Sequence, residues 1–339
     1  MIELRSDTFT IPSKNMLHFM INAKVGDDVW EEDLSVNDFQ KKFSKIFSME
    51  SALFCASGTM SNQIAIKVHT QPGDEVICDY NSHIYQYEAG GPSFNSGVSL
   101  NLINGNNGKL NKNLIESSIK KSNIHYPKPT LVSLENTNNK AGGTCYDIND
   151  LREISKFCKK NNINLHLDGA RLFNAIIATD TIPSDYGLIF DSISICFSKG
   201  LGAPIGSLLL GSETFIKKAR RIRKIFGGGM RQVGYLAAAC DFAFDNNFKY
   251  LNEDHRRAKK IESVLKDLKY VKEILPVETN IIIFKVSNVK KFISFMKKNN
   301  ILCESISTSK VRFVTNLSFD DNMLEKLIKK LKFYSKFDI

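Results

Sequence analysis

Short runs of apolar and β-branched residues alternate with longer amphipathic runs along most of this chain. The short runs predict strands at residues 52–56, 75–78, 131–134, 164–167, 192–197 and 207–210. Apolar residues at helical spacing predict helices between them, at 38–47, 60–70, 111–121 and 151–160. This alternation predicts an α/β fold with a mostly parallel central sheet, helices on both faces, and ligands at the carboxyl ends of the strands.

The pattern changes after about residue 244. A basic helix is followed by a predicted strand at 280–286, a helix at 289–299, a strand at 311–315 and a final helix. A chain of 339 residues is long enough for two domains. We therefore expect a large domain over residues 1–244, including the N-terminal segment, and a smaller α+β domain over 245–339.

The chain carries 46 Lys and Arg against 36 Asp and Glu, a formal net charge of +10. Two basic clusters, KKARRIRK at 217–224 and HRRAKK at 255–260, have the spacing of helices and lack interleaved aromatic residues. We interpret both as solvated helix faces and expect no nucleic-acid partner. A protein that binds nucleic acid through these helices is the alternative from another functional class.

Seven scattered cysteines form no CxxC pair, which favours reduced core thiols over disulfides or a zinc site. No apolar run is long enough to span a bilayer, and the opening MIELRSDTFT lacks the apolar core of a signal peptide. We expect a cytoplasmic protein without a membrane partner or a catalytic metal. A structural cation near Thr8 and Thr10 stays open.

Three segments that follow predicted strands carry polar residues that a core does not need. In SGTMSN (57–62), Gly58 permits a tight turn, and Thr59 with the first free amides of a helix suits a phosphate group. In HLDGAR (166–171), Asp168 ends an apolar strand and Arg171 lies nearby. A carboxylate at a buried strand end needs a cation or donor, and a protonated aromatic nitrogen is one candidate.

The third segment, CFSKGLGAP (196–204), places Lys199 on a turn of small residues. A lysine amine in a dry or cationic environment becomes nucleophilic and forms a Schiff base with a carbonyl compound. Pyridoxal phosphate needs such a lysine, an anion beside its ring nitrogen and donors for its phosphate. The order of these three elements on alternating strands therefore predicts pyridoxal phosphate as cofactor.

At this point the chain resembles the threonine aldolases, which belong to the aspartate-aminotransferase-like, type I fold of pyridoxal phosphate enzymes. The resemblance covers nearly the whole chain and rests on LRSDT (4–8), VGDDV (25–29), SGTMSNQ (57–63), PGDEVI (72–77), HIYQYEAGG (83–91), LENT (134–137), HLDGARLFNA (166–175), SKGLGAPIGS (198–207) and GGGMRQ (227–232).

The resemblance implies specific roles for the residues of these motifs. Lys199 would carry the cofactor and Asp168 would pair with its ring nitrogen. The remaining cofactor-binding residues would be Gly58, Thr59 and Ser198 at the phosphate, His83 stacked on the ring, Arg171, and Arg231 reaching the cofactor of a neighbouring subunit. The substrate carboxylate would be received by Ser6, Arg171 and Arg312, for which the bidentate guanidinium is well suited. Trp30 and Tyr87 lie in motifs that border the substrate side-chain pocket, although core packing is the alternative for both.

The implied reaction is cleavage of L-threonine or L-allo-threonine, a small β-hydroxy amino acid, to glycine and acetaldehyde. His83 or His125 is the expected base for the substrate hydroxyl, and the residues do not choose between them. The other histidines (His18, His69, His166 and His255) are interpreted as packing or surface residues. The nearest alternative reaction is β-elimination, or cleavage of a bulkier β-hydroxy amino acid, on the same fold. A homotetramer built as a dimer of dimers is expected.

Three departures from the family pattern stand out. DDVWEEDLSV (27–36) has Trp30 and Glu31 where relatives often have tyrosine and glycine, and it lacks a proline. Asn138 and Asn316 stand where histidines are common. None of these changes removes the predicted cofactor residues, but the first bears on the entrance to the substrate pocket.

Overall fold

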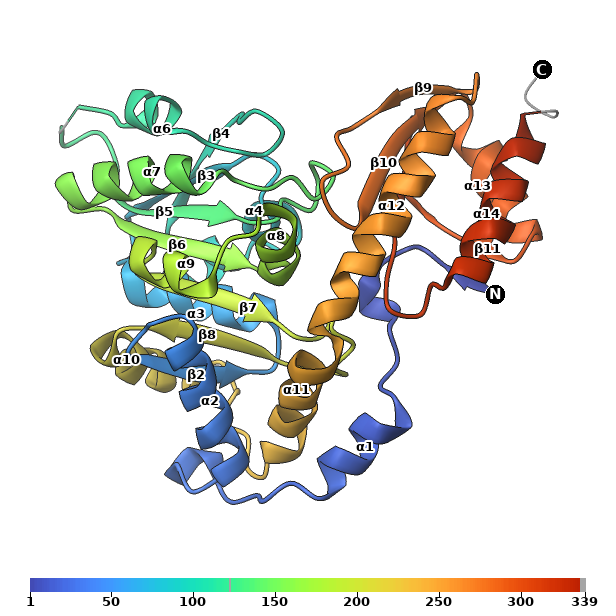
Figure 1. The fold of residues 1–339 in the computed structure, drawn as a ribbon. Coiled ribbons are helices and arrows are strands. Elements are labelled where there is room, and N and C mark those ends of the chain that lie inside the picture. Colours follow the sequence, from blue (N-terminus) through green and yellow to red (C-terminus); the bar gives the residue numbers. More distant parts are fainter. Residues whose placement is uncertain (122, 336–339) are drawn as a thin grey trace.

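The computed structural model describes residues 1–121 and 123–335 and contains a seven-stranded sheet, drawn in Figure 1. Its order is β2 (Ser51–Cys55), β8 (Ser207–Gly211), β7 (Ser192–Cys196), β6 (Asn164–Gly169), β5 (Pro129–Glu135), β3 (Glu75–Asp79) and β4 (Ser99–Ile103). Strands β7, β6, β5, β3 and β4 are parallel, and β8 is antiparallel to both β2 and β7. The predicted mostly parallel α/β sheet is confirmed.

Helices cover both faces of this sheet because side chains on neighbouring strand positions point to opposite faces. Leu53 of β2 packs with one helical layer, and Phe54 packs in the main core on the other face. The helices of this part are α1 (Lys14–Ile21), α2 (Leu34–Ile46), α3 (Gly58–His69), α4 (His83–Gln86), α5 (Gly91–Ser96), α6 (Lys112–Ser118), α7 (Ile148–Lys160), α8 (Leu172–Thr179), α9 (Pro183–Ile189), α10 (Glu213–Ile225) and α11 (Gly234–Asn247), with short 3₁₀ turns at Asp7–Phe9, Asp28–Trp30 and Phe248–Tyr250.

A second, antiparallel sheet stands beside the first and has its own core. Its order is β12 (Glu304–Ser305), β13 (Lys310–Val314), β10 (Ile281–Val286) and β9 (Val271–Ile274), and it packs with α12 (Leu251–Lys266), α13 (Val289–Lys298) and α14 (Asp321–Tyr334). In Figure 1 the arrows of β5, β6 and β7 point toward this second lobe. The carboxyl ends of the parallel strands therefore face the smaller sheet.

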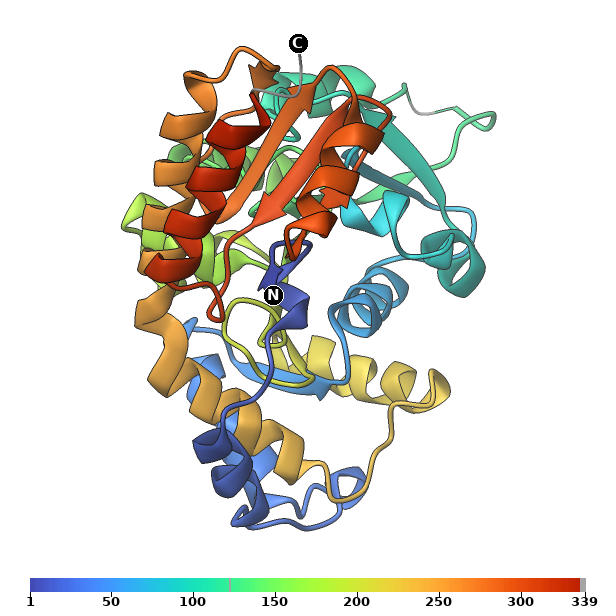
Figure 2. The ribbon, with the colours of Figure 1, turned by 90° about the vertical axis from the view of Figure 1, so that its right-hand side faces the viewer.

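The N-terminal segment joins the two lobes. Strand β1 (Ile2–Glu3) pairs in parallel with β11 (Ile301–Leu302), and Ile2 and Leu4 are buried in the core of the smaller lobe. From there the chain passes between the lobes to α1, as Figure 2 shows in blue. The predicted domain boundary between residues 244 and 245 stays a prediction. Ile2 and Leu4, which that boundary assigns to the large domain, pack in the core of the smaller lobe.

The predicted strands match observed strands to within about two residues at each end. The elements that were not predicted are the helices α1, α4, α5, α8, α9 and α11 and the strands β1, β4, β9, β11 and β12. Within the described residues, no helix combines the length and the apolar character that crossing a membrane requires. The seven cysteines are all buried and free of disulfides.

The first basic cluster is not simply a solvated face. Arg223 of α10 is 2% exposed, pairs with the buried carboxylate of Asp28, and donates to the carbonyl oxygen of Phe54 at 2.7 Å. Arg220 also approaches Asp28, at 3.8 Å, and Glu31 at 3.3 Å. Two of the cluster's charges therefore anchor the 27–33 loop against the sheet.

We expect Arg223→Met to lower the free energy of unfolding by about 3 to 5 kcal/mol, because it leaves the Asp28 carboxylate buried without its cation. Urea unfolding at neutral pH measures the change. Arg221→Met, on the exposed side of the same helix, is the matched control and should alter stability by less than about 0.5 kcal/mol. Equal effects of the two substitutions would show that the buried pair is not what anchors the loop.

Candidate active site

A cavity of about 510 Å³ opens between the two lobes, near the carboxyl ends of the parallel strands. Two other surface cavities have similar volumes, about 480 and 500 Å³, so size does not distinguish it. Its side chains do, since residues from both lobes and the N-terminal segment converge there. It is lined by Ser6, Thr8, His83, Tyr87, Asn139, Arg171, Lys199, Glu304, Ser305, Ile306 and Arg312.

Lys199 reaches this cavity from the turn after β7. Two hydrogen bonds to the backbone carbonyl oxygen of Lys199 hold this turn. The Gly202 N–H donates to it at 2.8 Å and the Thr10 hydroxyl at 3.0 Å. Among the residues that the structure describes, no hydrogen-bond acceptor or carboxylate contacts the amine of Lys199. The backbone is thus fixed while the amine stays available to a ligand.

Asp168 lies at the end of β6 and is 2% exposed. One carboxylate oxygen accepts from the Ala170 N–H at 3.1 Å, and the other accepts from the Asn62 side-chain amide at 2.8 Å. Each oxygen has a second lone pair that can accept a further hydrogen bond. The carboxylate can therefore receive an N–H donor from a bound ring.

The N-terminus of α3 lies against the end of β7. The Ser57 hydroxyl caps the helix by accepting from the Met60 N–H at 3.1 Å, which leaves the Gly58 and Thr59 N–H groups for a ligand. A Cβ atom at Gly58 would lie 2.7 Å from the sulfur of Cys196, so the close approach of helix and strand requires glycine there. Ser198, two residues after Cys196, is partly exposed on the same turn.

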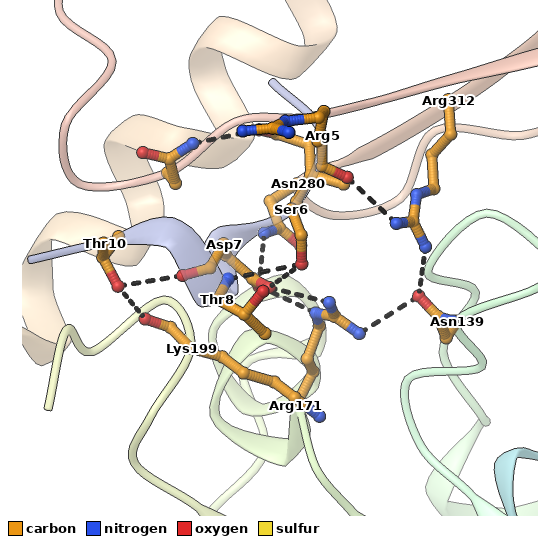
Figure 3. Close-up of polar contacts among 12 residues, drawn as sticks. Arg5, Ser6, Asp7, Thr8, Thr10, Asn139, Arg171, Lys199, Asn280 and Arg312 are labelled. Atoms are coloured by element: carbon orange, nitrogen blue, oxygen red, sulfur yellow. Dashed lines mark hydrogen bonds and ion pairs between the residues drawn. The ribbon is translucent and has the colours of Figure 1, made fainter. Parts of the chain in front are cut away.

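Figure 3 shows two arginines, Arg171 from the turn after β6 and Arg312 from β13, which both reach Asn139. Arg171 makes a buried bidentate ion pair with Asp7, at 2.7 and 2.8 Å, and its third nitrogen donates to the Asn139 oxygen at 3.2 Å. Arg312 donates to the same oxygen at 3.1 Å and to the Arg5 carbonyl oxygen at 2.9 Å. Burial and the Arg171 charge lower the pKa of Arg312. Two cations that face one neutral oxygen suit an incoming carboxylate.

His83 lines the cavity, and three buried carboxylates, those of Glu88, Glu135 and Asp168, lie close to its ring. His83 Nδ1 lies 3.0 Å from a Glu88 oxygen, and one atom each of His83, Glu88 and Asp168 lie within 4.8 Å of one another. Burial lowers the pKa of His83, but the Glu88 hydrogen bond and the charges of Asp168 and Glu135 outweigh it and raise that pKa. Burial and the charge of Asp168 raise the pKa of Glu135 to about 7.

Comparison with known proteins identifies the family. The sequence model of the beta-eliminating lyase family matches residues 3–288. The chain is 38% identical to low-specificity L-threonine aldolase of Escherichia coli K12 over 330 residues, 96% of this chain and 97% of that protein. It is 38% identical to low-specificity L-threonine aldolase 1 of Arabidopsis thaliana over 323 residues, 92% of this chain and 90% of the relative. This chain is a member of the threonine aldolase family.

Solved structures agree on the fold. The threonine aldolase of Leishmania major superposes with a TM-score of 0.87 at 22% identity, covering 99% of this chain and 100% of that one. Histidinol-phosphate aminotransferase of Clostridium acetobutylicum gives 0.75 at 16% identity, covering 99% and 100%. The predicted aminotransferase-like fold is confirmed. The threonine aldolase family consists of lyases that use pyridoxal phosphate.

Not every residue predicted for a threonine aldolase site meets in this cavity. Tyr87 lines it, but Trp30 is 73% exposed on the 27–33 loop and Arg231 is held there by Asp27 at 2.8 Å. His125 is exposed and precedes β5, so it lies at the amino end of a strand whose carboxyl end faces the cavity. Trp30, Arg231 and His125 therefore belong to other surfaces of the same chain.

Five residues of this site were not predicted: Asp7, Asn62, Glu88, Glu135 and Asn139. Each lies in or beside a motif quoted above, but each forms a hydrogen bond or ion pair with a residue from a different motif or segment of the chain. Glu135, for example, accepts from the His83 N–H at 2.7 Å and the Asn139 N–H at 2.9 Å, and thereby joins two walls of the cavity. The available signal was a polar residue inside an otherwise apolar strand or motif.

We expect Asp7→Asn to lower the free energy of unfolding by about 2 to 3 kcal/mol at pH 7. Burial raises the pKa of Asp7, but the Arg171 ion pair outweighs it and lowers that pKa to about 2. The ionised group therefore contributes stability above its unfolded pKa, and this contribution is lost as the pH falls toward 2. Urea unfolding should show equal differences between variant and wild type at about pH 7 and 5, and about half that difference at pH 3.

Asp27→Asn provides the control for this measurement, because Arg231 of the Asp27–Arg231 pair is 56% exposed and such a solvent-accessible pair should contribute little. A difference between Asp7→Asn and wild type that is the same at low and neutral pH would contradict ionisation of Asp7 as its source.

Proposed function

We propose that this chain is a pyridoxal phosphate-dependent aldolase that cleaves L-threonine or L-allo-threonine to glycine and acetaldehyde. The observation that carries the proposal is that Lys199, Arg171 and Arg312 line one interlobe cavity together with His83, which lies beside the buried Asp168. Its relatives of known name are low-specificity L-threonine aldolases. The substrate is a small β-hydroxy amino acid, and the reaction is a carbon–carbon lyase reaction.

The residues present fit the cofactor. Lys199 has a free amine for its aldehyde group, Asp168 has acceptor capacity for its ring nitrogen, and Gly58, Thr59 and Ser198 offer donors for its phosphate. His83 lies beside Asp168, and the cofactor ring would stack on the His83 imidazole. The cofactor supplies a protonated ring that accepts the electron pair left on the substrate Cα.

The two arginines would orient the substrate. Arg312 and the third nitrogen of Arg171 share the Asn139 oxygen, and a substrate carboxylate would take a position that bridges both cations, with Ser6 at its side. Asp7 keeps the Arg171 guanidinium plane fixed, so little side-chain freedom is lost when the carboxylate binds. These contacts to the substrate carboxylate would therefore set which bond of Cα is presented for cleavage.

His83 is the base that this chain itself brings to the cavity. Its Nδ1 faces the Glu88 carboxylate and donates to it, so in the neutral ring the lone pair of Nε2 can take the proton from the substrate β-hydroxyl. The raised pKa of His83 lowers the share of neutral ring at a given pH. The Cα–Cβ bond then breaks, its electron pair stays with Cα, and Cβ leaves as the aldehyde carbon. Reprotonation of Cα completes glycine.

The first test is aldehyde release from L-threonine and L-allo-threonine, side by side, by wild type and Lys199→Ala, each supplied with pyridoxal phosphate. We expect wild type to release acetaldehyde with equimolar glycine, and Lys199→Ala to fall below about one thousandth of that rate. Lys217→Ala, an exposed lysine on α10, is the control and should leave the rate unchanged.

Other products would redirect the assignment. Ammonia and a 2-oxo acid would indicate β-elimination, the chemistry that names the matched family model. Cleavage of bulkier β-hydroxy amino acids in preference to both threonines would contradict the proposed substrate and leave the cofactor assignment in place.

We also propose a homotetramer, a dimer of dimers, in which neighbouring subunits complete each site. His125, Arg231 and Trp30 lie outside the cavity of their own chain, so a second copy must supply them if they act in it. The exposed apolar side chains Ile11, Phe19, Ile21 and Trp30 of the N-terminal region support a subunit contact there.

Subunit mixing tests this proposal directly. We expect His125→Ala and Lys199→Ala each to be inactive alone, and a co-refolded mixture to recover about a quarter of wild-type activity, because half of randomly formed pairs are hybrids with one intact site. Mixtures of Lys199→Ala with Asp168→Ala should recover nothing, because both residues serve the same chain's cavity. Recovery absent from the first mixture, or full activity of His125→Ala, would remove His125 from the site.

We place the enzyme in the cytoplasm, in threonine catabolism and glycine biosynthesis. Seven buried free thiols suit a reducing compartment. The products, glycine and an aldehyde, are those of amino-acid metabolism.

A further inference from the structure

A line of hydrogen-bonded polar side chains runs along one face of the large sheet, from the amino ends of its parallel strands to Asp168 at the carboxyl end of β6. It begins at His69, the last residue of α3, passes Ser192 at the start of β7 and His166 in β6, and reaches Asn62 in α3. His166 and Asp168 are two positions apart on β6 and therefore point to the same face. His69 lines a separate surface cavity at the far edge.

Each step of this line is a hydrogen bond. His69 Nε2 lies 2.8 Å from the Ser192 hydroxyl, and His166 Nδ1 lies 2.8 Å from the same hydroxyl. His166 Nε2 lies 3.2 Å from the Asn62 oxygen. The Asn62 nitrogen donates to Asp168 at 2.8 Å and to Glu88 at 2.9 Å.

The chemistry of the groups gives the line a single direction. Carboxylates only accept, so the Asn62 NH₂ group must face Asp168 and Glu88, and the Asn62 oxygen must face His166. His166 Nε2 is therefore the protonated nitrogen. Burial lowers the pKa of His166 to about 4, so the ring is neutral and its Nδ1 accepts from the Ser192 hydroxyl. That hydroxyl in turn accepts from His69 Nε2, and burial also lowers the pKa of His69, to about 3.

The Asn62 end of the line meets two groups of the active site. Asp168 is the proposed partner of the cofactor ring nitrogen. Glu88 also accepts from the Gln63 amide at 2.6 Å and faces His83 Nδ1 at 3.0 Å. The Asn62 NH₂ group uses one hydrogen for each carboxylate, and a proton on either contacted oxygen would weaken that bond because it removes the negative charge of the acceptor.

We propose that Asn62 and His166 are positioning residues of this active site. They hold Asp168 and Glu88 as hydrogen-bond acceptors, and through Glu88 they keep His83 in the form protonated at Nδ1, with the Nε2 lone pair directed to the substrate. The proposal deepens the proposed function, on which its catalytic meaning rests. Without Asn62, two buried carboxylates would stand close together with no donor between them, a situation that favours protonation of one.

The direction can be measured without cofactor or substrate. In ¹⁵N-histidine-labelled protein at about pH 9, where imidazole side chains are neutral, we expect nitrogen chemical shifts that assign His69 and His166 to the Nε2–H form and His83 to the Nδ1–H form. Single histidine variants assign the signals. An Nδ1–H form of His166 would overturn the proposal, since it reverses the bond to Asn62.

The functional arm compares two substitutions at one position. His166→Gln retains the direction, because its amide can donate to Asn62 and its oxygen can accept from Ser192. His166→Leu has neither group. We expect His166→Leu to weaken pyridoxal phosphate binding and to lower kcat by about 10- to 100-fold with KM little changed, and His166→Gln to stay within about threefold of wild type.

The same change at another buried histidine separates positioning from packing. His255 is buried, burial lowers its pKa to about 4, and it contacts Asn174 outside the line. His255→Leu should lower the unfolding temperature while the His83 signal and the affinity for pyridoxal phosphate stay as in wild type. Equal losses of affinity in the Leu and Gln variants at 166 would reduce the line to a packing feature.

The arms also separate this inference from the proposed function. Nuclear magnetic resonance and cofactor binding need no substrate, so expected tautomers and affinities in a wild type that releases no aldehyde would leave the positioning role intact and remove the aldolase assignment. If His166→Leu does not fold, Ser192→Ala tests the same line: loss of the donor to His166 Nδ1 should shift that nitrogen signal and weaken cofactor binding.

Discussion

The buried carboxylate of Asp7 is the interaction on which the rest of the site depends. It receives Arg171 from the large lobe and Asn280 from the small lobe, at 3.2 Å in the latter case, while its own segment carries Thr10 to the Lys199 turn (Figure 3). One anion therefore fixes three parts of the chain around the cavity. Removing it would leave Arg171 as a buried cation without a partner, which is more costly than losing one contact.

The same principle recurs in the large lobe, where other buried carboxylates are held by groups from distant parts of the sequence. Asp28 is held by Arg223 of α10, and Asp168 by Asn62 of α3. Burial and the charge of Asp168 raise the pKa of Glu135 to about 7, and its carboxylate still accepts from the backbone N–H groups of His83 and Asn139. A site that must bind a charged cofactor and a charged substrate is thus assembled from charges that are already compensated.

Much of the fold, and the placing of the proposed cofactor residues at one edge of the sheet, could be predicted from sequence, and the reason is geometric. Parallel strands bring their carboxyl ends to one edge, so Gly58, Asp168 and Lys199, each following a predicted strand, were expected together, and β6 and β7 are adjacent. The antiparallel direction of β8 was not predictable, because periodicity carries no information on strand direction. Asp7, Asn139 and Asn280 were missed because each matters through a partner more than a hundred residues away or in another lobe. His166 was interpreted as a packing residue, since a single buried histidine gives no sign of its neighbours.

The three departures from the family pattern differ in where they lie: Asn138 and Asn316 are buried in loops, whereas Trp30 is exposed. Asn138 is fully buried, where its oxygen accepts from the Ala141 N–H at 3.0 Å, and Asn316 donates to the Glu3 carbonyl oxygen at 3.0 Å. Both therefore stabilise loops, and neither lines the cavity. Trp30, by contrast, is exposed on a loop anchored by Asp27 and Asp28 to the arginines of α10 and of the segment before α11. A rigid loop that presents a large aromatic side chain away from its own site can influence substrate choice only in a second copy. In the proposed tetramer, differences in side-chain preference between this enzyme and its relatives would follow the contact between subunits, while the chemistry of Cα–Cβ cleavage follows the cavity of the single chain.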